Sequence, residues 1–259
     1  MPSGCSLWAK GLARRTILGW MCYPPPQIPS PGVFSAMKEI IAGTKAFRND
    51  HYLAQQTFYQ DLAKGQTPHC VLVTCSDSRI VVSQMTQMGP GKIFTIRNAG
   101  NIVPPYDAKA PATGEWATIE YALHVLKLKD IIVCGHRHCG AMQGLVTHVK
   151  APELPSLGQW LSYSGETMKN VQAHYGKLND VQEKTTAAAC ENVLQQLENL
   201  KTHPAVKKGL DAGTLNLHAW LYEFDNGTVS AFEEEVGQFV PLNHSESTLP
   251  KRKVAKRKL

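Results

Sequence analysis

Two short clusters of polar residues carry the side chains that could do chemistry. The first is CSDSR at 75–79, and the second is GHRHCG at 135–140. Together they offer the thiols of Cys75 and Cys139 and the imidazole of His136. Two thiolates and one imidazole suit a zinc ion, and three protein ligands leave a fourth coordination position for water. The clusters therefore predict a zinc site that can activate a water molecule.

The elements that must position these clusters are buried strands. Two short apolar runs rich in β-branched residues, Cys70–Thr74 and Ile131–Cys134, lead directly into the clusters, and a third such run lies at Ile93–Ile96. Open α/β sheets bind ligands just past the carboxyl ends of their parallel strands. If the first and the last of these runs are neighbours in the sheet, the two clusters meet at one point.

The same residues also have purely structural interpretations. A lone cysteine at a strand end is commonly a small buried hydrophobic residue, which is how we interpret Cys70, Cys134 and Cys190. An H-x-x-C spacing also arises by chance, and a four-cysteine structural zinc site would need paired C-x-x-C motifs, which the sequence lacks. The placement of both clusters at equivalent strand ends, with Asp77 and Arg79 beside one of them, favours the metal site.

The remaining pattern predicts an α/β fold. Helical periodicity and a hairpin signal at Asn226-Gly227 complete the element order. The expected helices cover about 113–128, 157–175 and 181–200, after two helical stretches that follow Met37, and the hairpin joins strands at 215–224 and 228–232. Strands that alternate with helices predict a mostly parallel sheet flanked by helices on both faces, with N-terminal helices and an added C-terminal strand pair.

We expect one domain at 37–243 between two extensions. Residues 1–36 contain no acid and a proline-rich stretch, so they read either as a targeting leader or as a mis-assigned start before Met37. Residues 244–259 read as a basic disordered tail. A chain of 259 residues with 43% apolar residues can bury one full core.

The net charge of +6 comes from the two extensions. The last nine residues carry six basic side chains and residues 1–36 carry three, which leaves the body between them mildly acidic. A nucleic-acid reader usually carries its basic patch on the folded body, so we expect no nucleic-acid partner. No run reaches about 18 apolar residues, so we expect no transmembrane segment.

Four segments resemble the characteristic segments of β-class carbonic anhydrases. They are CSDSR (75–79), IRNAGNIVPPY (96–106), EYAL (120–123) and GHRHCGAM (135–142). The similarity extends over about residues 37–242 and is greatest to the plant-type and cyanobacterial or cyanase-associated bacterial branch. Because several segments agree in order and spacing, the resemblance is specific.

The resemblance implies a full set of roles. It implies one zinc ion per subunit on Cys75, His136 and Cys139, and a catalytic dyad of Asp77 and Arg79. It also implies an obligate homodimer or a higher oligomer of dimers. The substrate pocket that it implies is lined by Gln66, Phe94, Ala99, Tyr121 and Gly140.

The implied reaction is the reversible hydration of carbon dioxide to bicarbonate and a proton by zinc-bound hydroxide. Zinc lowers the pKa of its water from about 15.7 toward about 7, but two thiolates cancel its charge. Asp77 is therefore expected to accept a hydrogen bond from the hydroxide and aim it, kept ionised by Arg79. In some relatives this aspartate becomes a fourth zinc ligand in a closed state, and the Gln66 segment favours the open one. His138 is a candidate proton relay, with a solvated surface histidine as the alternative.

Two other functions and several locations stay open. The same ligands and dyad could serve a carbon disulfide or carbonyl sulfide hydrolase, and a zinc-stabilised scaffold with low activity would use the basic tail at 251–259. Seven scattered cysteines favour a reducing compartment, so we expect a cytoplasmic protein. Residues 1–36 leave a carbon-concentrating compartment, an organelle or an exported location open.

Overall fold

The computed structural model describes residues 36–148, 152–242 and 249–253. The chain divides into two compact units, Met1–Gln56 and Thr57–Leu259. The predicted leader lies almost wholly outside the described residues, as does most of the predicted tail. Among the described residues, no helix combines the length and the apolar character needed to span a membrane.

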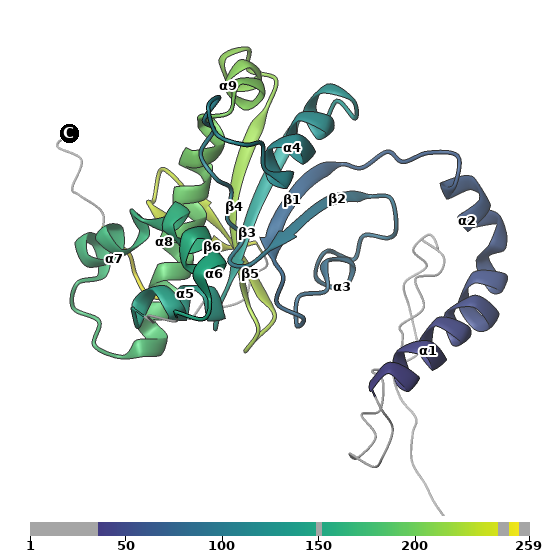
Figure 1. Cartoon of the computed structure of the whole chain (residues 1–259), viewed down its shortest axis with the longest axis horizontal. Coiled ribbons are helices and arrows are strands. Elements are labelled where there is room, and N and C mark those ends of the chain that lie inside the picture. Colours follow the sequence, from purple (N-terminus) through teal and green to yellow (C-terminus); the bar gives the residue numbers. More distant parts are fainter. Residues whose placement is uncertain (1–35, 149–151, 243–248, 254–259) are drawn as a thin grey trace, which may run out of the picture. The chain divides into compact units, whose positions relative to one another are not determined.

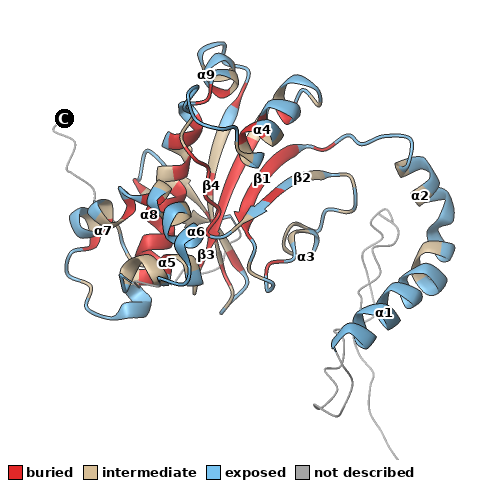
Figure 2. Cartoon of the chain, in the orientation of Figure 1, coloured by how far each residue is buried: buried red, intermediate tan, exposed pale blue. Residues whose placement is uncertain are grey.

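The described part of the first unit, residues 36–56, is helical and exposes apolar side chains. It contains α1 (Ala36–Ala46), a π-helical stretch at Phe47–Tyr52 and a 3-10 turn at Leu53–Gln55. Ile40 and Ile41 lie on one side of α1 and are 57% and 48% exposed, and no residue of α1 is buried (Figure 2). An amphipathic helix of this kind has an apolar stripe, and no described residue of its own unit buries it.

The second unit is built on a six-stranded sheet in the order β2-β1-β3-β4-β5-β6 (Figure 1). The first four strands in this order run parallel, and β5 and β6 are antiparallel. The expected mostly parallel sheet with a C-terminal strand pair is confirmed, with one further strand, β6. The strands are β1 (Cys70–Cys75), β2 (Ile93–Asn98), β3 (Asp130–His136), β4 (Asn216–Glu223), β5 (Thr228–Glu233) and β6 (Gln238–Pro241).

Helices connect the strands. They are α2 (Gln56–Leu62), α3 (Val82–Thr86), α4 (Gly114–His124), α5 (Gly140–Val146), α6 (Pro155–Leu161), α7 (Thr167–Tyr175), α8 (Val181–Lys201) and α9 (Pro204–Asp211). The helix predicted over 157–175 is wrong as one element: it is broken into α6, a 3-10 turn at Ser162–Ser164, and α7. The Ser164 hydroxyl donates to Asn192 Oδ1 of α8 at 2.7 Å, and Gly165, a weak helix former, follows it.

The two faces of the sheet are covered unequally. On one face Val71, Val73 and Val133 join a large core that includes the buried side of α8 (Figure 2). On the other face Leu72 and Ile132 belong to a small cluster whose only helical cover in the described chain is α3. A cavity of about 420 Å³ opens on this second face. Among the described residues of the second unit, this face of the sheet is therefore partly apolar and only partly covered.

Part of the predicted tail docks on the folded body. Leu249 is buried in the core, and Arg252 Nε lies 2.6 Å from Oε1 of Glu191, which is 1% exposed. The Arg252 N–H also donates to Gln238 of β6, and the Lys253 N–H donates to the carbonyl of His174. Residues 249–253 thus differ from the disordered tail that the charge run indicates, because Arg252 has a buried anionic partner.

Candidate metal centre

Three buried ligand groups converge at the carboxyl ends of two neighbouring strands. Cys75 ends β1, His136 ends β3, and Cys139 immediately precedes α5. Their two sulfur atoms and the imidazole nitrogen lie within 4.8 Å of one another. The strands β1 and β3 pair in parallel, with Val73 opposite Val133. The structure thus brings together the three residues that the sequence selects.

The imidazole of His136 is oriented for a ligand role. Its Nδ1 lies 2.7 Å from the Arg137 carbonyl, and since a carbonyl can only accept, Nδ1 carries the proton. Its buried Nε2 has no hydrogen-bond partner in the described part of the protein. Metal-bound histidines commonly donate their second ring N–H in this way, and a buried nitrogen left unpartnered is costly. The histidine therefore fits a metal ion.

The two thiols form one electrostatic unit. The Gly100 N–H lies 3.4 Å from Cys75 Sγ. Hydrogen bonding from Cys139, together with backbone N–H groups, lowers the pKa of Cys75 to about 4. The Cys75 thiolate and burial in turn raise the pKa of Cys139. Without a cation, the two thiols cannot both be ionised. A divalent cation would stabilise both thiolates, so the pair suits such an ion.

The remaining described cysteines differ from this pair. Cys70, Cys134 and Cys190 are free and buried. Burial raises the pKa of Cys134 to about 12 and also raises the pKa of Cys190. These thiols therefore stay protonated and pack as small apolar groups.

Asp77 lies beside the ligands and is held by Arg79. Arg79 Nε and Nη2 donate to Asp77 Oδ1 and Oδ2 at 2.9 and 2.7 Å, and Asp77 Oδ2 is 3.9 Å from His136 Nε2. The Arg79 side chain holds the pKa of Asp77 well below its usual range. Arg97 of β2 donates to the carbonyls of Cys75 and Asp77 at 3.1 and 2.8 Å. The carboxylate is therefore ionised and fixed next to the cluster.

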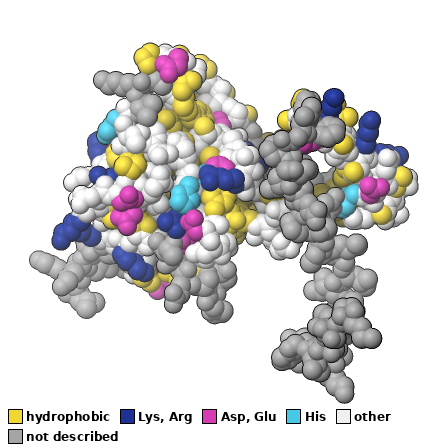
Figure 3. Space-filling model, turned by 90° about the horizontal axis from the view of Figure 1, so that it is seen from below, with side chains coloured by type: hydrophobic (Ala, Val, Ile, Leu, Met, Phe, Trp, Pro, Cys, Tyr) yellow, Lys and Arg dark blue, Asp and Glu magenta, His cyan; other side chains and the backbone are white. Residues whose placement is uncertain are grey.

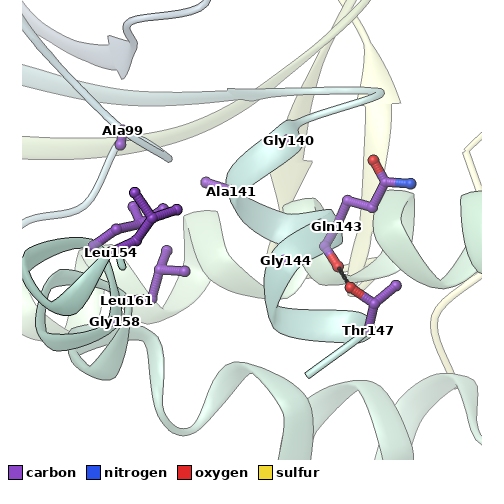
Figure 4. Close-up of a pocket in the computed structure, with 10 residues that line it drawn as sticks. Ala99, Gly140, Ala141, Gln143, Gly144, Thr147, Leu154, Gly158 and Leu161 are labelled. Atoms are coloured by element: carbon purple, nitrogen blue, oxygen red, sulfur yellow. Dashed lines mark hydrogen bonds between the residues drawn. The ribbon is translucent and has the colours of Figure 1, made fainter. Parts of the chain in front are cut away.

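Two of the five predicted pocket residues line one apolar cavity. Ala99 and Gly140 face a cavity of about 550 Å³ between α5 and α6, together with Leu154, Leu157 and Leu161 (Figure 4). Ala99 is followed by the glycine that contacts Cys75, and Gly140 follows Cys139. This cavity therefore begins at the wall of the metal centre.

The other three predicted pocket residues lie elsewhere within one copy of the chain. Phe94 and Tyr121 stack on each other with ring centroids 5.9 Å apart, and Tyr121 is 44% exposed. Gln66 is exposed in the segment before β1. The described chain thus divides the expected pocket into separate parts.

The sequence reasoning missed residues at the end of β4 that touch the site. The Phe224 ring meets the His136 ring edge-on, with centroids 5.2 Å apart, and Arg79 Cζ lies 4.4 Å from the Phe224 centroid. Asp225 accepts a hydrogen bond from His138. The sequence offers one signal for these residues, the position of Phe224 and Asp225 at the end of a predicted strand.

Comparisons with known proteins identify relatives of this chain. The carbonic anhydrase family profile matches residues 70–229. A carbonic anhydrase of Synechocystis sp. is 40% identical over 205 residues, which cover 79% of this chain and 74% of the relative. A carbonic anhydrase of Pseudomonas aeruginosa is 38% identical over 208 residues, covering 80% of this chain and 92% of the relative.

Solved structures agree with these relatives. The β-carbonic anhydrase CcaA is 39% identical with a TM-score of 0.75, and the match covers 80% of this chain and all of that one. One of two tetrameric β-carbonic anhydrases from Sordaria macrospora is 29% identical with a TM-score of 0.60, and the match covers 75% and 92% of the two chains. The matched region contains both polar clusters.

Proposed function

The chain belongs to the β class of the carbonic anhydrase family, and we propose that it hydrates carbon dioxide reversibly at one zinc ion held by Cys75, His136 and Cys139. The observation that carries the proposal is the buried cluster of these ligands beside the ionised carboxylate of Asp77. A pure scaffold would have no need for that carboxylate.

The zinc ion, when bound, supplies the Lewis acidity that lets a water molecule lose a proton near neutral pH. Asp77 does the orienting. Because Arg79 occupies one edge of its carboxylate, the remaining lone pairs can accept a hydrogen bond from the attacking oxygen and aim that oxygen at the substrate carbon. Bicarbonate then leaves, and the proton passes to buffer.

We assign the open form to the resting site. Closing it by moving Asp77 onto the ligand cluster would break both side-chain hydrogen bonds from Arg79. Arg79 would keep the acceptor at the His138 carbonyl, 3.1 Å from Nη2, but would lose its ionic partner. The geometry therefore supports an aspartate that acts on the nucleophile and does not replace it.

The substrate pocket is completed by a second copy of the chain. Ala99 and Gly140 offer an apolar cavity wall that suits an uncharged linear substrate. Gln66, Phe94 and Tyr121 would come from the partner subunit, since they lie apart from this wall within one copy. In this assembly Gln66 donates to an oxygen of bicarbonate.

Homodimer formation, or a higher oligomer of dimers, has its own support. The exposed apolar stripe of α1 and the partly covered face of the sheet are complementary in character, and a second copy would bury both. The two solved β-carbonic anhydrases from Sordaria macrospora are themselves tetrameric.

Charge and thiols support the substrate class and the location that we propose. Figure 3 shows basic side chains scattered among acidic and apolar ones on one face of the molecule, which supports a small-molecule substrate. The five cysteines in the described ranges are free thiols, which supports a cytoplasmic location. Mass spectrometry of the mature N-terminus tests that location and the role of residues 1–36.

The decisive test of the proposed mechanism is the Asp77→Asn variant. Stopped-flow carbon dioxide hydration should fall by at least about 100-fold, with zinc content unchanged, because the amide cannot accept the hydrogen bond as the carboxylate does. Asp211→Asn, which alters an exposed aspartate paired with Lys207 in α9, should match the wild type. Wild-type turnover in Asp77→Asn would remove the dyad from the mechanism. Sulfide release from carbonyl sulfide, measured in parallel, would reveal hydrolase activity.

A further inference from the structure

The segment that follows β4 lies against the loop of the metal centre. β4 pairs with β3 so that Tyr222 is opposite His136, and the Arg137 N–H donates to the Tyr222 carbonyl at 2.9 Å. This parallel pairing carries Phe224 and Asp225 past the end of β3. Both residues therefore come beside the loop that connects the metal ligands.

Asp225 clamps that loop with its carboxylate. Its Oδ2 lies 2.8 Å from Arg137 Nη1, and its Oδ1 accepts from His138 Nε2 at 3.1 Å. The side-chain amide of Gln182, at the start of α8, lies 3.3 Å from the other ring nitrogen of His138. The imidazole of His138 thus donates to Asp225 and has a polar neighbour at its second nitrogen.

The backbone of His138 has a conformation that is uncommon for a residue with a side chain. Its φ of 56° lies in the left-handed region, which residues other than glycine rarely adopt. In this conformation its carbonyl accepts a hydrogen bond from Arg79 Nη2 at 3.1 Å, and the same Nη2 donates to Asp77 Oδ2 at 2.7 Å. The position of the His138 carbonyl therefore helps to fix the plane of the guanidinium.

Phe224 supports the guanidinium from another side. Arg79 Cζ lies 4.4 Å from the centroid of the Phe224 ring, within cation–π range. A chain of contacts thus runs from Asp225 through His138 to Arg79 and Asp77, and the ring of Phe224 packs against the guanidinium of Arg79.

We propose that Asp225 is a positioning residue for the Asp77–Arg79 dyad and that it acts through the backbone of His138. The inference rests on the proposed function, in which the dyad aims the attacking oxygen. The ion pair of Asp225 is with Arg137 and its hydrogen bond is from His138, so its removal leaves the ligands and the dyad chemically intact. What changes is the position of the carbonyl that Arg79 uses as its third acceptor.

The test compares Asp225→Asn with the wild type as zinc-loaded, full-length protein. In saturating buffer, kcat is expected to fall by about 10- to 100-fold, since a displacement of about 1 Å can cost that much, with KM and zinc content unchanged. Asp225→Glu should recover part of the loss, and Asp211→Asn should show none. An unchanged kcat in Asp225→Asn would overturn the proposal.

Buffer dependence separates positioning from proton relay. If Asp225 and His138 passed a proton to solvent, the loss in Asp225→Asn would disappear as the buffer concentration rises. Recovery of wild-type kcat at saturating buffer would therefore contradict the positioning role. A loss that persists at every buffer concentration is the expected result.

The route through His138 has its own test. Glycine adopts positive φ without strain, so His138→Gly keeps a carbonyl at this position without the imidazole that Asp225 clamps. Adding Asp225→Asn to His138→Gly should cost no further activity. Losses that multiply in the double variant would show that Asp225 acts by another route.

A crystal structure of the metal-free Asp225→Asn protein gives a readout independent of turnover. The distance from Arg79 Nη2 to the His138 carbonyl should exceed hydrogen-bond range, and an unchanged 3.1 Å would contradict the proposal. Asp77→Asn identifies which idea fails. If it is slow while Asp225→Asn is fast, only the present inference falls. If Asp77→Asn is also fast, the proposed function falls with it.

Discussion

The carboxylate of Asp77 accepts two side-chain hydrogen bonds from Arg79, at 2.9 Å to Oδ1 and 2.7 Å to Oδ2. The backbone N–H of Arg79 adds a third bond to Oδ1 at 3.0 Å. This bidentate grip fixes a charged group two residues after the ligand Cys75. The proposed chemistry depends on that charge and its direction.

Replacing Arg79 should therefore slow the enzyme without emptying the metal site. In Arg79→Met the pKa of Asp77 rises toward the ordinary 3.8, so the carboxylate stays ionised near neutral pH but loses its orientation. We expect turnover to fall by about 10- to 100-fold. The check is stopped-flow hydration between about pH 6 and 9, with zinc measured on the same samples.

The sign of the pH effect is set by the depressed pKa of Asp77. Its ion pair stabilises the wild-type fold above the ordinary carboxyl pKa and is lost only as the pH falls below it.

The matched control for Arg79→Met is Lys64→Met. It removes another exposed ion pair, with Asp61, and should leave turnover unchanged. Equal turnover in Arg79→Met and Lys64→Met would contradict a role for the grip.

The apolar stripe of α1 should hold subunits together. Ile40→Glu places a charge on that stripe, which in an oligomer is buried, so the variant should dissociate at concentrations where the wild type does not. Ala46→Glu adds the same charge to the opposite side of α1 and should leave the assembly intact. The measurement is the mass of the assembly by sedimentation for both variants. An Ile40→Glu protein that keeps the wild-type mass would argue against this interface.

The docked end of the chain should stabilise the fold. In Arg252→Ala the carboxylate of Glu191, which is 1% exposed, loses its cation and, among the described residues, keeps the ring of His174 as its polar partner, with Nδ1 at 3.1 Å. Removing one member of a buried pair costs about 3 kcal/mol. Urea unfolding should show this loss.

Two further variants check that assignment. Lys253→Ala, which removes an exposed lysine one position on, should change the free energy of unfolding by less than about 0.5 kcal/mol. Glu191→Gln in the Arg252→Ala background should recover part of the stability, because the unpaired charge is gone. Identical unfolding curves for Arg252→Ala and the wild type would mean that residues 249–253 contribute nothing.

His203 should make the fold sensitive to mild acid. Burial against Trp116 and Tyr106 lowers the pKa of His203 below 6.5, so the folded state holds it neutral while the unfolded chain protonates it. The stability it contributes is complete above pH 6.5 and is lost as the pH falls below that value, by at most about 1.4 kcal/mol per pH unit.

The measurement compares the free energy of unfolding of the wild type and His203→Gln across this range. As the pH falls, the free energy of unfolding of the wild type should fall relative to that of the variant, because glutamine does not titrate. A difference that stays constant from neutral pH to about pH 5 would show that His203 titrates alike in both states.

The sequence predicts the strands of the sheet well, because short β-branched runs such as Ile131–Cys134 are buried on both sides and leave little ambiguity. The observed strand extends this run to Asp130–His136. Helix boundaries are less predictable, since contacts such as that of Ser164 with α8 are not visible in local periodicity. The prediction also missed α9, although Pro204 in its first turn is a local signal for a helix start, and it missed β6.

The candidate site shows a similar division. The convergence of Cys75, His136 and Cys139 follows from two clusters at the ends of neighbouring parallel strands, so it can be expected from the sequence. The contact of Phe224 with Arg79, and the clamp of Asp225 on His138, depend on how β4 pairs with β3. The pairing of distant strands leaves no local signal in the sequence.

The central claim is tested most directly by zinc content and carbon dioxide hydration measured together in two alanine variants. Cys139→Ala removes a proposed ligand and Cys190→Ala removes a cysteine that is equally buried, each being 1% exposed. The wild type and Cys190→Ala should hold one zinc per chain and hydrate carbon dioxide at the same rate, while Cys139→Ala should lose the metal and the activity. A Cys139→Ala protein with full zinc and wild-type hydration would contradict the account.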